Sequence, residues 1–293
     1  MVEDRHGRGG ERRPRSSSGG SGGSGNSQKR GPRTEREARW SGLGRARPAQ
    51  PQGGLPDGEG APRGGIEGLE GPPVPQGVDA RQLAPEVRRE LSTLDRATAD
   101  AVARHLVAAG QLLDDDPEAA LSHARAARAR ASRIAAIREA VGIAAYHCGD
   151  WGQALSELRA ARRMGSKSPL LALLADCERG LGRPERAIEL ARGPEAAQLA
   201  GDDADELRIV AAGARADLGQ LDQALAVLST PQLDPNRTGS TAARLFYAYA
   251  DTLLALGRDD EALQWFLRSA GADIEGVTDA EDRVAELGSA EKK

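Results

Sequence analysis

The chain has 293 residues, a formal net charge of −4 and two cysteines. Two cysteines provide neither a disulfide framework nor the ligand spacing of a metal site, and no apolar run approaches the ~20 residues that a membrane-spanning helix needs. The charge is uneven, because residues 1–77 carry 13 Arg/Lys and 9 Asp/Glu, a net of +4, which leaves −8 for residues 78–293.

Residues 1–77 have the composition of a disordered tail rich in Gly, Pro and Arg. They hold 20 of the 36 Gly and 9 of the 16 Pro, with few apolar side chains. Such a segment cannot bury enough surface to offset its ordering entropy. Its Arg8-Gly9-Gly10 and Arg63-Gly64-Gly65 triplets are of the kind that tracks nucleic-acid backbones electrostatically. The tail is therefore expected to be either a solubilising linker or a contact for nucleic acid.

Residues 78–96 are expected to form an amino-terminal capping segment. Pro85 suits the first turn of a helix that runs through Leu94, with Val87 and Leu91 on the same apolar stripe. Such a helix would cover the apolar end of the domain that follows.

A repeat begins near residue 97. Its skeleton is a glycine followed five residues later by Ala-Leu or Ala-Ile, at Gly149, Gly182, Gly219 and Gly257, with Asp115 in the same place upstream. The anchor alanines are 34, 33, 37 and 38 residues apart, at Ala120, Ala154, Ala187, Ala224 and Ala262. A period in this range marks a helical solenoid. Apolar positions at helical spacing on both sides of the turn predict two antiparallel helices per unit, which stack to bury their apolar faces.

Two further columns of the repeat predict how the helices pack. Small residues stand twelve before each anchor, at Ala108, Gly142, Ala175, Ala212 and Ala250, and these let a second helix approach closely. Apolar residues stand four after it, at Ala124, Leu158, Ala191, Leu228 and Phe266. Pro194 and Pro231 interrupt the third and fourth units, whose second helices are therefore expected to be short.

At these positions the chain resembles the tetratricopeptide repeat (TPR) family. The best-matching unit carries Gly142, Gly149, Trp151, Ala154, Leu158 and Ala161 in the signature places. The resemblance covers residues 97–275 and implies an all-α, superhelical solenoid of about five helix-turn-helix repeats behind a disordered tail. The chain also resembles uncharacterised actinobacterial TPR proteins with an Arg/Gly-rich tail, a resemblance that implies a bacterial protein and brings no activity with it.

Residues 276–293 are expected to form a carboxy-terminal capping helix and tail. Thr278 and Glu281 have the spacing of a capping box, and Val284 and Leu287 lie on the apolar face of the helix that would follow.

The resemblance implies that the first helices of the repeats line a concave groove for a partner. By repeat register its main candidates are Glu139, Tyr146, Asp176, Arg179, Asp217, Arg244, Tyr247 and Asp251, with His105, Ile143 and Ile209 as further members. Tyr247 is expected to be an anchor, because Tyr and Arg dominate binding hot spots. A Lys/Asn clamp for a peptide carboxylate is excluded, because residues 78–235 contain no Asn and only one Lys, Lys167.

Three arginines stand in register on the second helices. Arg125, Arg159 and Arg192 each lie five residues after an anchor alanine and are expected to align as an Arg ladder on the outer face. The ladder is either a solvated charged face or a docking strip for an acidic protein or for phosphates.

The sequence contains no motif for phosphate loops, serine hydrolysis or zinc catalysis. His105, His123 and His147 are expected to be separate polar or half-buried helix residues. We therefore expect no enzyme, cofactor, metal or small-molecule substrate. The predicted function is a non-catalytic interaction scaffold that binds a peptide or helix in the groove. The alternative is an RNA- or ribosome-associated factor that uses the basic tail and the Arg ladder. Without an apolar signal segment, the expected location is the cytoplasm.

Overall fold

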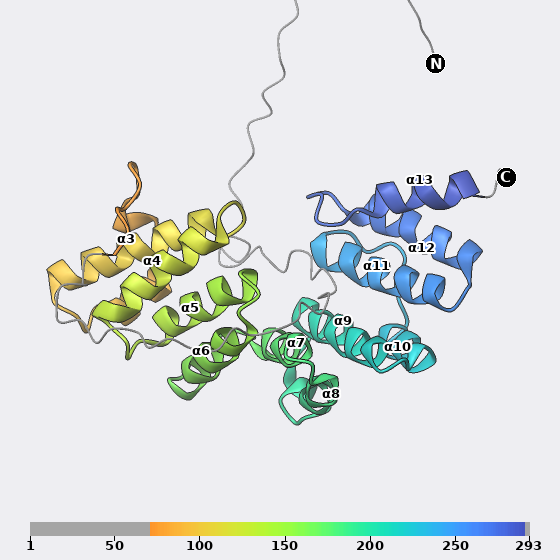
Figure 1. Cartoon of the computed structure of the whole chain (residues 1–293), viewed down its shortest axis with the longest axis horizontal. Helices are drawn as coiled ribbons and strands as arrows, with labels where there is room; N and C mark the ends of the chain where they lie inside the picture. The colour runs from red at the N-terminus through yellow and green to blue at the C-terminus, as the bar shows by residue number, and fades with distance from the viewer. Residues whose placement is uncertain (1–70, 291–293) are drawn as a thin grey trace, which may run out of the picture. The chain divides into compact units, whose positions relative to one another are not determined.

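A computed structural model describes residues 71–290, which form twelve α-helices and two short 3₁₀ helices, without strands in that range (Figure 1). The expected disordered tail lies outside the described residues, except for residues 71–77. The helices are η1 (Ala80–Gln82), α2 (Pro85–Leu91), α3 (Arg96–Leu112), α4 (Pro117–Arg130), α5 (Ala135–His147), α6 (Trp151–Arg163), α7 (Leu171–Gly180), α8 (Pro184–Ala191), η2 (Ala196–Gln198), α9 (Asp202–Asp217), α10 (Leu221–Leu228), α11 (Ser240–Ala255), α12 (Asp259–Ala272) and α13 (Ala280–Ala290).

Helices α3 to α12 pair into five hairpins: α3/α4, α5/α6, α7/α8, α9/α10 and α11/α12 (Figure 1). The second helix of each hairpin also packs on the first helix of the next, through the pairs α4–α5, α6–α7, α8–α9 and α10–α11. Each hairpin thus buries its apolar faces against its neighbours in sequence. This arrangement confirms the predicted all-α, TPR-like solenoid of five repeats.

The recurring glycine ends the first helix of four hairpins. Gly149, Gly182, Gly219 and Gly257 have φ values of 73°, 71°, 72° and 71°, a region that residues with a Cβ rarely adopt. The N–H of the residue after each glycine donates to the carbonyl five residues back, in Asp150→Ala145, Arg183→Glu178, Gln220→Arg215 and Arg258→Leu253. These are Schellman motifs, which satisfy the last carbonyls of a helix and turn the chain sharply.

The predicted anchor and small-residue columns form the contacts inside the hairpins. All five anchor alanines, Ala120, Ala154, Ala187, Ala224 and Ala262, are 0% exposed. At Gly142 an added Cβ would lie 2.7 Å from Leu158 Cγ and 3.2 Å from the Leu158 backbone nitrogen. Helices α5 and α6 therefore touch at this point through backbone, as the small-residue column predicted.

The second helices of the third and fourth hairpins are short, as expected. Helices α8 and α10 have 8 residues each, whereas α4, α6 and α12 have 14, 13 and 14. Pro194 and Pro231 stand three residues beyond the ends of α8 and α10. The chain continues from α8 through η2, and from α10 through a loop over residues 229–239.

Helices α2 and α13 pack on the two ends of the stack. Helix α2 has Pro85 in its first turn and buries Val87 and Leu91, but it ends at Leu91 rather than Leu94. Helix α13 packs Val284 and Leu287 against the core of the last hairpin.

The predicted capping box of α13 is wrong. The backbone N–H and hydroxyl of Thr278 both donate to the carboxylate of Asp273 at 2.7 Å, and α13 begins two residues later, at Ala280. The Thr278 side chain therefore stabilises the turn after α12 instead of capping α13.

Candidate interaction surface

Predicted groove residues on α5, α7 and α9 bind one another in a continuous chain. The Tyr146 hydroxyl of α5 donates to Asp176 of α7. Arg179, one turn further along α7, donates from Nη1 to Asp176 at 2.8 Å and from Nε to Asp217 of α9 at 2.8 Å. Three successive first helices are thus joined by polar links, and we call the surface that carries these links the first-helix face.

The surroundings of Tyr146 and Arg179 keep the phenol protonated and the guanidinium charged. Burial and the negative charge of Asp176 raise the pKa of Tyr146, so the phenol stays a donor. Burial would lower the pKa of Arg179, but the bonds and charges of Asp217 and Asp176 raise it above its ordinary value. The guanidinium also packs over Gly213 of α9, where an added Cβ would lie 2.7 Å from Arg179 Cζ.

Arg244 links α9 to α11, whereas Glu139, another predicted groove residue, binds a loop. Arg244 of α11 forms a largely buried ion pair with Glu206 of α9, and burial raises the pKa of Glu206 against the opposing effect of that arginine. Glu139 of α5 is buried and accepts hydrogen bonds from Ser166 at 2.8 Å and Ser168 at 2.6 Å, both in the loop before α7. Glu139 therefore holds a loop between hairpins.

Side chains of α12, of α13 and of the turn between them cover part of Tyr247 and Asp251. Arg283 of α13 lies 3.6 Å from the Asp251 carboxylate. The Tyr247 ring meets Phe266 edge-on at 5.2 Å, and burial together with a hydrogen bond to Asp279 raises the pKa of its phenol. Tyr247 is thus half-buried. The Asp217 and Asp251 side chains, 40% and 60% exposed, are the more open acidic groups of this face.

Two members of the predicted Arg ladder bridge neighbouring hairpins. Arg125 of α4 donates to Gln153 of α6, and Arg159 of α6 forms an ion pair with Glu178 of α7 at 2.6 Å. Arg192, at the end of α8, is exposed and forms no ion pair with any residue in the described range. Part of the basic excess on the second helices is therefore neutralised within the fold.

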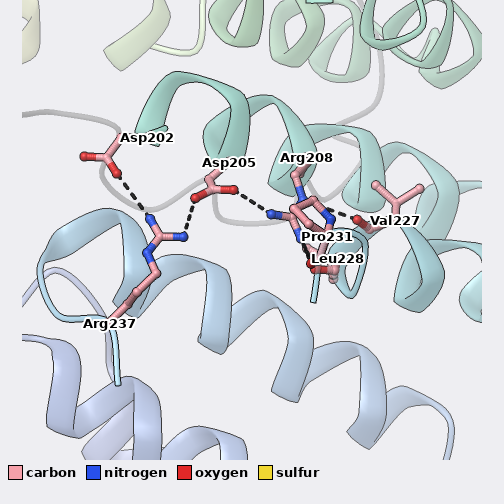
Figure 2. Close-up of polar contacts among 7 residues, drawn as sticks. All are labelled: Asp202, Asp205, Arg208, Val227, Leu228, Pro231 and Arg237. Atoms are coloured by element: carbon pink, nitrogen blue, oxygen red, sulfur yellow. Dashed lines mark hydrogen bonds and ion pairs between the residues drawn. The ribbon is translucent and has the colours of Figure 1, made fainter. Parts of the chain in front are cut away.

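The long loop after α10 is tied to α9 by two further arginines (Figure 2). Arg237 in the loop contacts Asp205 at 2.6 Å and Asp202 at 3.3 Å. Arg208 pairs with the other oxygen of Asp205 at 2.6 Å and donates to the carbonyls of Val227, Leu228 and Pro231. All three nitrogens of Arg208 thus donate within the fold.

The structure brings together two histidines that we expected to be separate. His105 of α3 and His123 of α4 are 4% and 3% exposed, with their Nδ1 atoms 3.0 Å apart. Burial, with smaller effects from the charges of Arg130 and His123, lowers the pKa of His105 to about 4, and burial also lowers that of His123. The repeat register assigned His105 to the concave groove, but both histidines are buried inside the first hairpin, so this contact could not be predicted from the register.

Within residues 71–290, no group of three or more His, Cys, Asp or Glu residues is arranged to hold a metal ion. Cys148 and Cys177 are free thiols, and burial, with the charges of Asp176 and Glu178, raises the pKa of Cys177 to about 12. In the same range, no helix combines the length and the apolar character needed to cross a membrane.

Comparisons with protein-family models and with curated proteins find no match to this chain. Solved structures that are similar include the crystal structure of YrrB, described as a TPR protein with an unusual peptide-binding site. The two chains are 21% identical, the match covers 68% of this chain and 95% of the YrrB chain, and the TM-score is 0.42. The TPR-like fold of this chain therefore rests on the geometry of its own five hairpins.

Proposed function

We propose that the chain is a non-catalytic scaffold that binds a peptide or helix of a partner protein on the first-helix face. The observation that supports this most is the chain of links from Tyr146 through Asp176 and Arg179 to Asp217. Tyr146 and Asp176 are buried, and they hold Arg179 and, through it, the exposed Asp217 in fixed positions before any partner arrives. Side chains that are already ordered lose less entropy on binding, which favours affinity for an extended partner.

The charge of this face favours a basic partner segment. Residues 200–293 carry nine Arg/Lys and 18 Asp/Glu, a net of −9. Asp217 and Asp251 are exposed acids towards the ends of α9 and α11, the first helices of the last two hairpins. Complementary charge would steer a basic peptide or helix to α9 and α11 and set its register there.

Tyr247 lies at the edge of the proposed binding site. Its ring is partly covered by Phe266 and its hydroxyl is held by Asp279, so a partner would contact the remaining open edge. We expect Tyr247→Ala to weaken partner binding about tenfold, the effect of losing ~1.4 kcal/mol.

The experiment compares two pairs of neutralised acids. The test variant is Asp217→Asn with Asp251→Asn on first helices, and the matched control is Asp222→Asn with Asp260→Asn on the exposed second helices of the same hairpins. Proteins captured from a native lysate are identified, and binding of the purified partner is measured by calorimetry. The test pair should weaken binding about tenfold, whereas the control should leave it unchanged. Equal effects of the two pairs would contradict binding on this face.

The same capture, repeated with nuclease, decides the alternative of an RNA- or ribosome-associated factor. The expected tail contact lies outside the described residues, and Arg125 and Arg159 already bind Gln153 and Glu178. Partners that are lost after nuclease treatment would favour the alternative over the scaffold.

A further inference from the structure

A hollow of about 350 Å³ lies among α8, η2, α9 and α10. It is found where α8 ends after 8 residues and the chain turns through η2 into α9. Its wall is mostly apolar, with Ile188, Ala191, Ala196, Leu207, Ala211 and Val227, and three arginines, Arg192, Arg208 and Arg215, also line it. The volume falls in the range of small-molecule and side-chain pockets.

Arg215 is a buried cation without a counter-charge. Its side chain belongs to α9, and the residue is only 7% exposed. Its two hydrogen bonds both leave from Nη1, to the amide oxygens of Gln220 at 3.0 Å and of Gln223. No carboxylate in the described part of the chain pairs with it, and its Nε and Nη2 have no described hydrogen-bond acceptor. Neither nitrogen is among the enclosed atoms of the described residues that lack a partner, so an anion in the hollow would supply a counter-charge at donors that are still open to it.

Arg208 lines the same hollow but, unlike Arg215, has a carboxylate partner and hydrogen bonds from each of its nitrogens. It pairs with Asp205 and donates to three backbone carbonyls, as Figure 2 shows. The donors left for a ligand therefore belong to Arg215 and to Arg192, which is exposed at the end of α8.

Two interfaces between hairpins can be compared: the first joins the second and third hairpins, and the second joins the third and fourth hairpins, where the hollow lies. Arg159 and Arg192 both lie five residues after an anchor alanine, and Glu178 and Arg215 both lie nine residues before the next one. At the first interface these positions form the Arg159–Glu178 ion pair at 2.6 Å. At the second interface the same positions hold two arginines that line one hollow. The carboxylate that Glu178 supplies at the first interface has no counterpart in the second.

We propose that the hollow binds a carboxylate carried on an apolar body. The carboxylate would lie between Arg215 and Arg192, and the apolar body would pack on Ile188, Leu207 and Val227. A carboxylate fits better than a phosphate, because the equivalent internal partner is a glutamate and most of the wall offers no donors. This site lies beyond the proposed function, since none of its residues belongs to the set proposed for the first-helix face.

Two probes measure binding and identify the source of the carboxylate. Octanoate represents a free aliphatic acid, and an acetylated peptide ending in Leu-Leu with a free carboxylate represents a chain terminus. Their neutral controls are octanamide and the amidated peptide. Calorimetry should show that at least one acid binds about tenfold more tightly than its amide, and the tighter acid names the source. Equal binding of acid and amide, or no binding of either acid at about 10 mM, would overturn the proposal.

Substitutions then place the binding in the hollow. Arg215→Met should weaken binding of the better acid about tenfold, whereas Arg186→Met should not. Arg186 is a matched control because it is an exposed arginine of α8 that pairs with Glu189 instead of lining the hollow. If Arg215→Met does not fold, Arg192→Met serves in its place, since Arg192 is exposed. Normal acid binding by the folded variant would refute the site.

Arg215→Glu tests the proposal without any ligand. It places a carboxylate opposite Arg192, as Glu178 stands opposite Arg159. We expect this variant to melt at or above the temperature of the wild type and to lose acid binding. A Tm below that of Arg215→Met would show instead that Arg215 serves only to hold Gln220 and Gln223.

Discussion

Replacing Gly142 by alanine tests the close packing of the hairpins directly. Gly142 lies within α5, and its added Cβ would meet Leu158 of α6 at 2.7 Å from Cγ and 3.2 Å from the backbone nitrogen. The side chain of Leu158 can rotate away, but its nitrogen can move only with α6. Gly110, within α3, is the matched control, because no atom lies within 4 Å of the position that its Cβ would take.

Two opposing effects set the expected magnitudes. Replacing a glycine by alanine inside a helix stabilises by about 1 kcal/mol, and this is the whole effect expected at Gly110. Overpacking a filled contact costs about 1–3 kcal/mol, so Gly142→Ala should be destabilising by up to about 2 kcal/mol. The free energies of unfolding of the two variants should therefore differ by about 1–3 kcal/mol.

Urea unfolding followed by circular dichroism measures this difference. The midpoint should rise for Gly110→Ala and fall for Gly142→Ala, with the slope m unchanged in both, because the surface exposed on unfolding stays the same. If both variants gain stability equally, α5 and α6 do not approach as closely as described, and the small-residue column has no packing role.

Two further predictions concern buried titratable groups. The pKa of His105 is lowered from 6.5 to about 4, so the unfolded chain binds more protons between these values, and stability present above pH 6.5 should be lost as the pH falls to about 4. At 1.36 kcal/mol per unit the loss is at most about 3 kcal/mol, and His105→Gln should flatten the dependence of the urea midpoint on pH across this window. Iodoacetamide followed by intact-mass measurement should find two free thiols after denaturation, with Cys148 reacting first in the native protein, because burial raises the pKa of Cys177 to about 12. A native disulfide between them would contradict the assignment.

The hairpins were predictable because their signals are local and periodic. A glycine at the end of each first helix, an alanine five residues later and small residues at helical spacing determine each turn and its closest contact without reference to distant residues. The prolines that shorten α8 and α10 act in the same local way. The local signals failed at the two caps: α2 ends three residues before Leu94, and in the turn before α13 Asp273 competes for Thr278 within five residues.

The partners of charged side chains were decided by the tertiary structure. Sequence register places Arg179 and Asp217 on adjacent first helices, but their bond across 38 residues depends on the distance between hairpins and on the gap that Gly213 leaves. His105 and His123 meet for the same reason, because two helices cross where both point inward. The hollow around Arg215 exists because a helix ends early, and an arginine stands where the previous hairpin has a glutamate. Backbone periodicity follows from short-range sterics, whereas ion pairing depends on sub-ångström placement of long side chains, which only the packed chain determines.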